Sequence, residues 1–312
     1  MLTTVKKVCA LAGLSLLFLL SGCQSTPQAD KLRQEGLASL PESHTIQSVP
    51  FIPQEQYYCG PTTLSEVFGY YGRTTSPNDI APKLFIPNKE GSLQLEMITA
   101  TRQFGFLPYN ERGTLSSLMS LVKDDIPVIV FQNLSIQLLP QWHYAVVIGF
   151  DSDKGTVKLH TGLTANHEMS LELFERTWAR ANYWYMAPVP PGKASSHMKP
   201  YGYVSAAYDI LKVNDEKTAL AFLETATHQW PDYWLSYFLL ANYYMEQNRD
   251  VAIQWFEKGF HVGSVQQAFV HNYALALSQN GERAKARSIL QSGLKQYPDD
   301  KLLNALNDKL KQ

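Results

Sequence analysis

Cys59 occupies a position where a thiol could serve as a nucleophile. It follows a polar loop, residues 54–58, and begins a stretch whose apolar residues recur at helical spacing as far as residue 71. A helix N-terminus presents free N–H groups and a positive partial charge, which stabilise a thiolate and lower the pKa of a cysteine. Gly60 permits close approach of a substrate backbone, and Pro61 suits the first helical turn. A buried structural cysteine is the alternative interpretation.

A candidate base lies far along the chain. His143 precedes an apolar stretch, residues 144–150, that predicts a strand. From such a strand edge, the imidazole could face the helix start across a cleft and accept the thiol proton. A glutamine shortly upstream can place its side-chain amide beside the backbone N–H of Cys59, and these two donors would form an oxyanion hole. The spacing therefore favours thiol-dependent acyl chemistry.

One folded domain, which we place at residues 48–191, must position these side chains. Helical spacing precedes strand-like stretches along this segment, an order that predicts an α+β domain. The expected helices are residues 58–71, 95–104 and 115–123, and the expected strands are residues 127–131, 144–150 and 156–160.

Six short motifs follow one another in this domain: residues 49–54 (VPFIPQ), 59–61 (CGP), 91–94 (GSLQ), 127–128 (PV), 142–147 (WHYAVV) and 174–178 (FERTW). In these motifs the segment resembles papain-like cysteine peptidases related to the bacteriocin-processing, double-glycine type, in the lipoprotein branch with C-terminal tetratricopeptide repeats. The resemblance implies that Cys59 is the nucleophile and that His143 is the general base and then the general acid. It also implies that Gln54 is the oxyanion donor, with Gln56 as the alternative.

The sequence departs from this family at the residue that orients the histidine. Relatives usually carry an acid on the strand after the histidine, whereas that strand ends here at Thr161. We expect Thr161 to accept a hydrogen bond from the imidazole, as a weaker orienting group than a carboxylate. Asn166 and Asp151 are the alternatives, each from a neighbouring loop. Loss of the acid lowers the rate more than it abolishes the chemistry, because this group mainly fixes the tautomer and direction of the ring.

Residues 1–22 have the features of an export signal, with two lysines before an apolar stretch that is too short to span a bilayer. The tetrapeptide Leu20-Ser21-Gly22-Cys23 resembles a lipobox, where signal peptidase II cleaves before a cysteine that is then diacylated. An ordinary signal peptide with a chance cysteine is the alternative. We expect a lipoprotein anchored to the membrane through Cys23. The residues that follow favour the outer membrane of a Gram-negative bacterium, facing the periplasm.

Two polar segments flank the predicted peptidase domain. Residues 23–47 show little periodicity and predict a tether that holds the domain away from the membrane. Proline, glycine and serine between residues 192 and 198 predict a linker.

The last segment, residues 199–312, has helical spacing throughout. A shift of 34 residues aligns Ala252 with Ala286 and Gly259 with Gly293, which is the tetratricopeptide period. An unrelated helical bundle is the alternative. The predicted fold is therefore an α+β papain-like peptidase domain followed by an all-α tetratricopeptide-repeat domain.

Three functions fit this organisation. The first is an exported cysteine peptidase that acts on a peptide or protein, with the repeats binding a protein partner. The second is an acyl or peptidyl transferase with the same cysteine and histidine, and the third is a non-catalytic, peptide-binding assembly lipoprotein. The formal net charge of −1 and the absence of a basic stripe argue against nucleic acid as a partner. No histidine or cysteine cluster has metal-ligand spacing, and we expect no cofactor.

Overall fold

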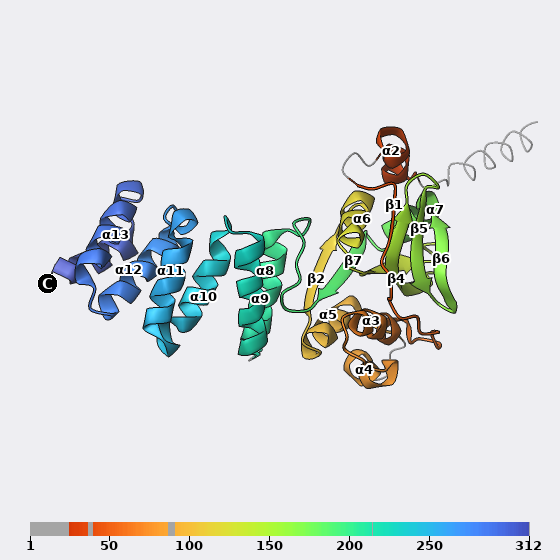
Figure 1. Ribbon diagram of the computed structural model, residues 1–312, viewed down its shortest axis with the longest axis horizontal. Helices are drawn as coiled ribbons and strands as arrows, with labels where there is room; N and C mark the ends of the chain where they lie inside the picture. The colour runs from red at the N-terminus through yellow and green to blue at the C-terminus, as the bar shows by residue number, and fades with distance from the viewer. Residues whose placement is uncertain (1–24, 37–39, 87–90, 214, 312) are drawn as a thin grey trace, which may run out of the picture.

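The structure is a computed structural model that describes residues 25–36, 40–86, 91–213 and 215–311. An α+β domain comes first, and an array of paired helices extends from it as a long arm (Figure 1). This order confirms the predicted fold class. The lipobox, residues 20–23, lies outside the described residues. Within the described ranges, no helix is both long and apolar enough to cross a membrane.

A seven-stranded sheet forms the centre of the first domain. Its strands follow the order β2-β7-β3-β4-β5-β6, and β1 pairs with the end of β4. The strand that carries His143, β4, lies in the interior of the sheet, and its residues 144–150 are buried. The strands are β1 Ser43–Thr45, β2 Leu107–Arg112, β3 Val128–Asn133, β4 Trp142–Asp151, β5 Thr156–Thr161, β6 Thr164–Ser170 and β7 Trp184–Val189.

Helices cover the sheet, and the predicted helix that begins near Cys59 is present as α3, which packs against β4. In Figure 1, α3, α4 and α5 lie below the sheet, α2 lies above it, and α6 lies beside the upper part of the strands. Capping boxes begin α4, at Ser76 and Asp79, and α6, at Thr114 and Ser117. The helices of this domain are α2 Pro27–Glu35, α3 Cys59–Tyr70, α4 Pro77–Leu84, α5 Gln94–Gln103, α6 Leu115–Lys123 and α7 Leu171–Ala179.

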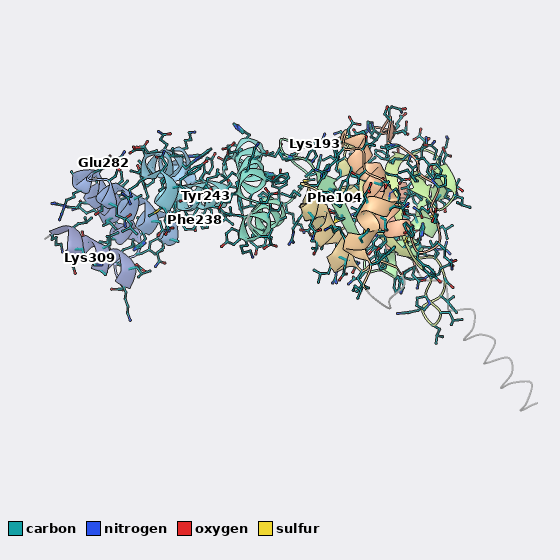
Figure 2. All side chains as sticks on the ribbon, turned by 90° about the horizontal axis from the view of Figure 1, so that it is seen from below. Phe104, Lys193, Phe238, Tyr243, Glu282 and Lys309 are labelled. Atoms are coloured by element: carbon teal, nitrogen blue, oxygen red, sulfur yellow. The ribbon has the colours of Figure 1, made fainter. Side chains whose placement is uncertain are left out.

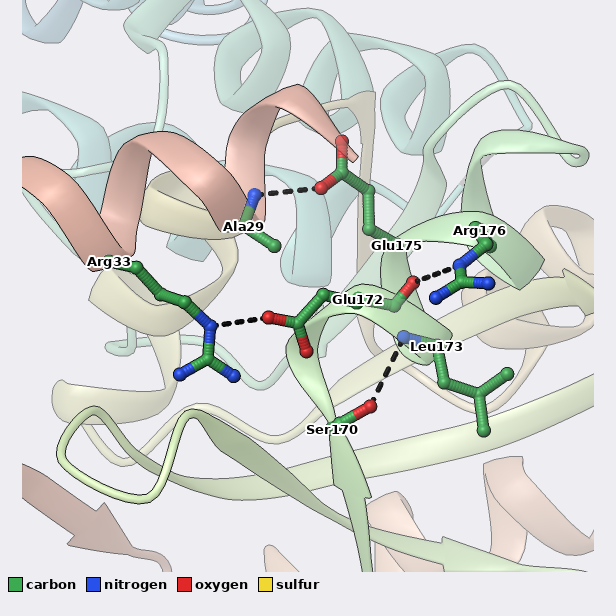
Figure 3. A network of polar contacts seen from close by, with 7 residues as sticks. All are labelled: Ala29, Arg33, Ser170, Glu172, Leu173, Glu175 and Arg176. Atoms are coloured by element: carbon green, nitrogen blue, oxygen red, sulfur yellow. Dashed lines mark hydrogen bonds and ion pairs between the residues drawn. The ribbon is translucent and has the colours of Figure 1, made fainter. Parts of the chain in front are cut away.

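The prediction of a tether at residues 23–47 is wrong for the part that the structure describes. Helix α2 packs against α7, and Ala29 is fully buried. The backbone N–H of Ala29 donates to Oε2 of Glu175 over 2.7 Å, and Arg33 pairs with Glu172 (Figure 3). These contacts join residues more than a hundred positions apart, so the local sequence pattern does not reveal them.

The predicted linker at residues 192–198 is also packed onto the domain. The hydroxyl of Ser195 donates to Oδ2 of Asp124 over 2.6 Å, and Nζ of Lys193 donates to the carbonyl of Asp124 over 2.8 Å. Figure 2 shows Lys193 at the junction of domain and array. Met198 is buried. The segment fixes the array to the domain and does not act as a flexible connection.

The array has the geometry that the 34-residue period predicts. A side chain at Gly259 would lie 2.5 Å from Cβ of Tyr237, and one at Gly293 would lie 2.6 Å from Cγ1 of Val270. Both glycines therefore stand where two helices touch closely. The helices are α8 Pro200–Lys212, α9 Glu216–Gln229, α10 Trp234–Gln247, α11 Arg249–Gly263, α12 Gln267–Gln279, α13 Arg283–Gln296 and α14 Lys301–Lys311.

The first helix pair of the array shares a core with the sheet. Tyr203 of α8 and Phe222 of α9 are fully buried and belong to the same apolar cluster as Tyr109 of β2. The backbone N–H of Lys199 donates to the hydroxyl of Tyr109 over 2.9 Å. The array and the α+β domain therefore form one continuous body at this edge of the sheet.

Candidate active site

Cys59 is the first residue of α3 and is partly exposed in a cleft of about 780 Å³. His143, the second residue of β4, lines the same cleft. The structure thus brings both predicted residues to one cavity, although they are far apart in the sequence. The other lining residues are Gln54, Glu55, Gln56, Tyr57, Gly91, Ser92, Leu93, Phe131, Pro140, Gln141, Trp142, Tyr144 and Gly162.

The imidazole of His143 is held by Thr161, the last residue of β5. Nε2 of His143 lies 2.8 Å from Oγ1 of Thr161. This contact occupies one ring nitrogen, so that Nδ1 is the nitrogen left for the thiol. Burial lowers the pKa of His143 to about 4, and the ring is therefore neutral at pH 7 and able to accept a proton.

The thiol of Cys59 is less acidic than the sequence suggests. Burial raises the pKa of Cys59, although the backbone N–H groups of Tyr144, Gly60 and Cys59 itself act in the opposite direction. The expectation of a lowered pKa was wrong because removal of the thiolate from water outweighs the effect of the helix N-terminus. The same hydrogen-bond pattern shows that the sulfur lies beside the backbone of Tyr144, the residue after His143. Thiol and imidazole are both neutral at rest.

Gln54 lies in the cleft, and its amide nitrogen has no partner among the described residues. This atom, Nε2, is buried. Its backbone N–H donates over 3.0 Å to the carbonyl of Gly162, which directly follows Thr161. A buried amide donor without a partner is what an oxyanion hole requires before substrate binds.

Two buried residues that the sequence interpretation missed hold the segment that carries Gln54. Oε1 of Glu66, which is fully buried on α3, accepts a hydrogen bond from the backbone N–H of Ile52 over 2.9 Å. Nε2 of His160 lies 3.1 Å from the carbonyl of Val49. The sequence showed only that a glutamate, Glu66, lies next to the apolar face of the predicted helix. This position does not reveal that its carboxyl group binds the backbone of Ile52.

Burial raises the pKa of Glu66 to about 8, and the hydrogen bond from the backbone N–H of Ile52 opposes this shift only in part. The carboxyl group is therefore largely protonated near neutral pH. This neutral state allows Glu66 to stay in the core and to hold the segment that carries Gln54.

The alternative positions for an orienting group lie elsewhere. Asp151 is at the far end of β4, about 26 Å from His143 for eight residues of strand, and its carboxylate accepts from the backbone N–H of Lys154. Asn166 donates its backbone N–H to Nδ1 of His160 over 3.2 Å. Gln56 lines the cleft but is exposed. Of the three candidate orienting residues, Thr161 is the one that hydrogen-bonds to the ring of His143.

The wall beside His143 is apolar and aromatic. Trp142 stacks on Phe131 with ring centres 5.0 Å apart, and 48% of its surface is exposed. Leu93, on another wall of the cleft, is 50% exposed. Trp178 and Trp184 are buried in the core, so Trp142 is the tryptophan available to a ligand in this cleft.

Comparisons with known proteins concern the first domain and the array separately. Residues 46–186 match the model of the Peptidase C39-like family. A C39-like peptidase structure from Bacillus anthracis is 17% identical, with a TM-score of 0.41, and covers 50% of this chain and 100% of its own. The peptidase domain of Streptococcus ComA is 23% identical, with a TM-score of 0.37, and covers 46% of this chain and 98% of its own.

The helical array also has a structural neighbour. The second tetratricopeptide-repeat domain of human RPAP3, in complex with an HSP70 peptide, is 14% identical, with a TM-score of 0.34. The match covers 38% of this chain and 99% of that domain. A search of curated proteins gave no match.

Proposed function

Because residues 46–186 form a domain of the Peptidase C39-like family, we propose that this protein is a cysteine peptidase that hydrolyses a peptide or protein through a thiol acyl-enzyme. The observation that carries the proposal is the cleft, which Cys59, His143 and Gln54 line together. Thr161 holds the imidazole at 2.8 Å and leaves Nδ1 for the thiol. A non-catalytic peptide clamp would not need a buried amide donor in the same cleft as a thiol.

In the first step of the proposed reaction, Nδ1 of His143 takes the proton from the thiol of Cys59 as the sulfur attacks the substrate carbonyl. The new C–S bond places a negative charge on the carbonyl oxygen. The amide of Gln54 and the backbone N–H of Cys59 stabilise that charge.

Collapse of this intermediate breaks the C–N bond, and the imidazolium returns its proton to the leaving amine. Water, activated by the neutral imidazole, then attacks the thioester, and the carbon–sulfur bond breaks to release the acid and the free thiol. An amine in place of water would give the transferase reaction.

Because Cys59 and His143 are both neutral in the empty cleft, the thiolate forms only when a substrate is bound. Since burial lowers the pKa of His143 to about 4 and raises that of Cys59, an ion pair is unfavourable in the empty cleft. Proton transfer is therefore coupled to attack on a bound carbonyl. Such a thiol is protected from unwanted reaction while no substrate is present.

Labelling and trapping test this proposal. Purified protein is incubated with peptide thioesters or a peptidyl thiol probe, and the mass of the adduct on Cys59 is measured. Cys59→Ala should abolish the adduct, and His143→Ala should reduce turnover about as much, because the two residues act as one unit. Gln54→Ala should lower the rate roughly 10²- to 10³-fold. A Cys59→Ala protein that still hydrolyses peptides would refute the mechanism.

We also propose that the protein is exported and anchored through acylated Cys23, facing the periplasm from the outer membrane. The lipobox supports this proposal, and only residues 24–26 separate Cys23 from the docked helix α2. Growth with labelled palmitate should mark the wild type. Label on Cys23→Ala, or its continued fractionation with the outer membrane, would show that the anchor lies elsewhere.

The repeat array is proposed to bind a protein partner or part of the substrate. It presents exposed aromatic side chains, such as Tyr201 and Tyr208 on α8, which are 68% and 41% exposed. Tyr243 and Phe238 lie further along the arm (Figure 2). Crosslinkers at these positions should capture a partner in whole cells. An equal yield of the same partner from crosslinkers at exposed positions of α7, in the first domain, would contradict this role.

A further inference from the structure

Ser92 is a buried residue in the wall of the cleft whose hydroxyl has no partner. It stands just before α5 and is 9% exposed. Its Oγ is buried and makes no hydrogen bond within the described structure. Leu93, the next residue, lines the same cleft. Ser92 thus belongs to the wall of the cavity that also holds the thiol, and its hydroxyl lies just beneath the surface of that wall.

The hydroxyl of Ser92 lies against the backbone of the nucleophile helix. A side chain at Gly60 would lie 2.4 Å from Oγ of Ser92 and 2.7 Å from its Cβ. Gly60 therefore leaves the space that Ser92 fills, one residue after Cys59. From the sequence, we expected Gly60 to let a substrate approach the backbone. In the structure, Ser92 makes this close approach.

The backbone of Ser92 is fixed while its hydroxyl is free. Its carbonyl accepts a hydrogen bond from the hydroxyl of Tyr144 over 3.3 Å. Tyr144 follows His143 on β4, so one strand positions both the imidazole and the loop that carries Ser92. Because its backbone is already fixed, Ser92 loses little conformational entropy when its hydroxyl binds a ligand.

A buried hydroxyl without a partner destabilises a folded protein, because the group has lost water and gained nothing. The cleft contains two such atoms, Oγ of Ser92 and Nε2 of Gln54. A peptide in the cleft offers carbonyl and N–H groups on both sides of the scissile bond. One substrate can therefore satisfy both atoms.

We infer that the hydroxyl of Ser92 binds the substrate by a hydrogen bond to the peptide backbone beside the scissile bond, while Gln54 serves the oxyanion. This inference rests on the proposed peptidase function. The two residues differ in when they act. Gln54 contacts charge that develops during the reaction, whereas Ser92 contacts the bound peptide before and during it.

The test compares Ser92→Ala with Ser120→Ala. Ser120 on α6 has the same exposed fraction, 9%, but its hydroxyl donates to the carbonyl of Ser116 over 2.8 Å. Each variant reacts with iodoacetamide, which has no peptide backbone, and with the dipeptidyl fluoromethyl ketone Z-Phe-Ala-FMK. Rates of modification at Cys59 are followed by mass spectrometry, and melting temperatures are recorded.

Ser92→Ala should lower the second-order rate with the peptidyl probe by about 3- to 10-fold, the effect of one neutral hydrogen bond. Its rate with iodoacetamide should match the wild type, and its melting temperature should be equal or higher because an unsatisfied hydroxyl is gone. Ser120→Ala should keep both rates and lose stability. This inverse relation between stability and peptide reactivity would not arise from a purely structural serine.

Equal peptidyl rates for Ser92→Ala and the wild type would overturn the role of Ser92 alone. Parallel losses with both reagents would overturn it as well, since they would indicate a displaced thiol. Wild-type protein that reacts with iodoacetamide but never with the peptidyl probe would instead refute the proposed peptidase function, and the role of Ser92 with it.

Discussion

Oγ1 of Thr161 lies 2.8 Å from Nε2 of His143, so a hydroxyl stands where relatives are expected to carry a carboxylate. A hydroxyl can orient an imidazole, but it adds no negative charge to stabilise the protonated ring. This difference agrees with the low pKa of His143, about 4, for which burial is the cause. The absence of a carboxylate beside the ring of His143 therefore favours the neutral state of the cysteine and the histidine.

The fall of the rate at low pH, the acid limb of the pH–rate profile, should depend on the pKa of His143. His143 must be neutral to accept the thiol proton, so kcat/KM should fall as the pH drops through about 4. Thr161→Asp should move that limb upward by about 1 to 3 pH units, because a carboxylate favours the imidazolium. Thr161→Val should leave the limb in place and lower kcat by about 3- to 10-fold. An unchanged limb in Thr161→Asp would contradict the contact.

Gly60→Ala should destabilise the protein through a clash with Ser92. The added Cβ would meet Oγ and Cβ of Ser92 at 2.4 and 2.7 Å, and overpacking of this kind costs about 1–3 kcal/mol. Chemical denaturation gives the free energy of unfolding. The double variant Gly60→Ala/Ser92→Gly is the matched control, because it removes the obstructing side chain. Additive losses in the double variant would show that the two residues do not meet.

Glu66 should give the folded protein an unusual dependence on pH. Its pKa is about 8 in the folded state against an ordinary value of 4.5, so the folded state binds more protons between these values. Stability should therefore fall as the pH rises through this window, by about 1.4 kcal/mol per unit. The lowered pKa values of His143 and His160 contribute with the opposite sign, and these contributions end only about one unit above pH 6.5. The difference between the wild type and a variant that cannot titrate at position 66 therefore isolates Glu66.

Glu66→Gln keeps an acceptor for the N–H of Ile52 but cannot titrate. Its free energy of unfolding, measured relative to that of the wild type, should rise as the pH increases from 6.5 to 8, because only the wild type loses the contribution of Glu66. Parallel curves for the two proteins would mean that the carboxyl group does not carry the effect.

Glu175→Gln should loosen the docked helix α2. The buried carboxylate accepts from the backbone N–H groups of Gln28 and Ala29, over 3.1 and 2.7 Å, and an amide can accept with only one of its two polar atoms. Trypsin should then cleave faster at Lys31 and Arg33. Glu172→Gln is the control, because it removes only the pair with Arg33 near the surface, where solvent screens the attraction. Equal cleavage rates in both variants would argue against the anchoring role of Glu175.

Truncation should separate the first helix pair from the rest of the array. Deletion of residues 199–312 removes Tyr203 and Phe222 from the core that they share with the sheet, and each buried side chain of this size contributes about 1.5–3 kcal/mol. We expect a lower melting temperature and aggregation. Deletion of residues 232–312 keeps α8 and α9 and should preserve the labelling of Cys59. Equal stability of the two truncated proteins would contradict the shared core.

The sequence patterns were informative where local periodicity and position carry the signal. Helix α3, strand β4 and the 34-residue repeat each follow from apolar spacing that repeats within a few turns or residues. The candidate dyad followed because a cysteine at a helix start and a histidine at a strand start have recognisable contexts. Thr161 followed from its place at the end of the next strand.

Features that depend on long-range contacts could not be predicted in this way. Helix α2 is nine residues long and is held by Glu175, which lies 146 positions beyond Ala29. Strand β6 is largely exposed and polar, so it lacks the alternation of a half-buried strand. The pKa of Cys59 depends on burial by the whole domain, which the helix N-terminus alone does not reveal.

The joint between α8 and β2 has a mechanical consequence. Since Tyr203 and Tyr109 share one core, and Lys193 and Ser195 fasten the intervening segment, the arm has no hinge where it leaves the sheet. If the array binds one part of a substrate chain, as proposed, the fixed joint sets the distance from that part to Cys59. The position of cleavage would then depend on the number of residues between the bound part and the scissile bond.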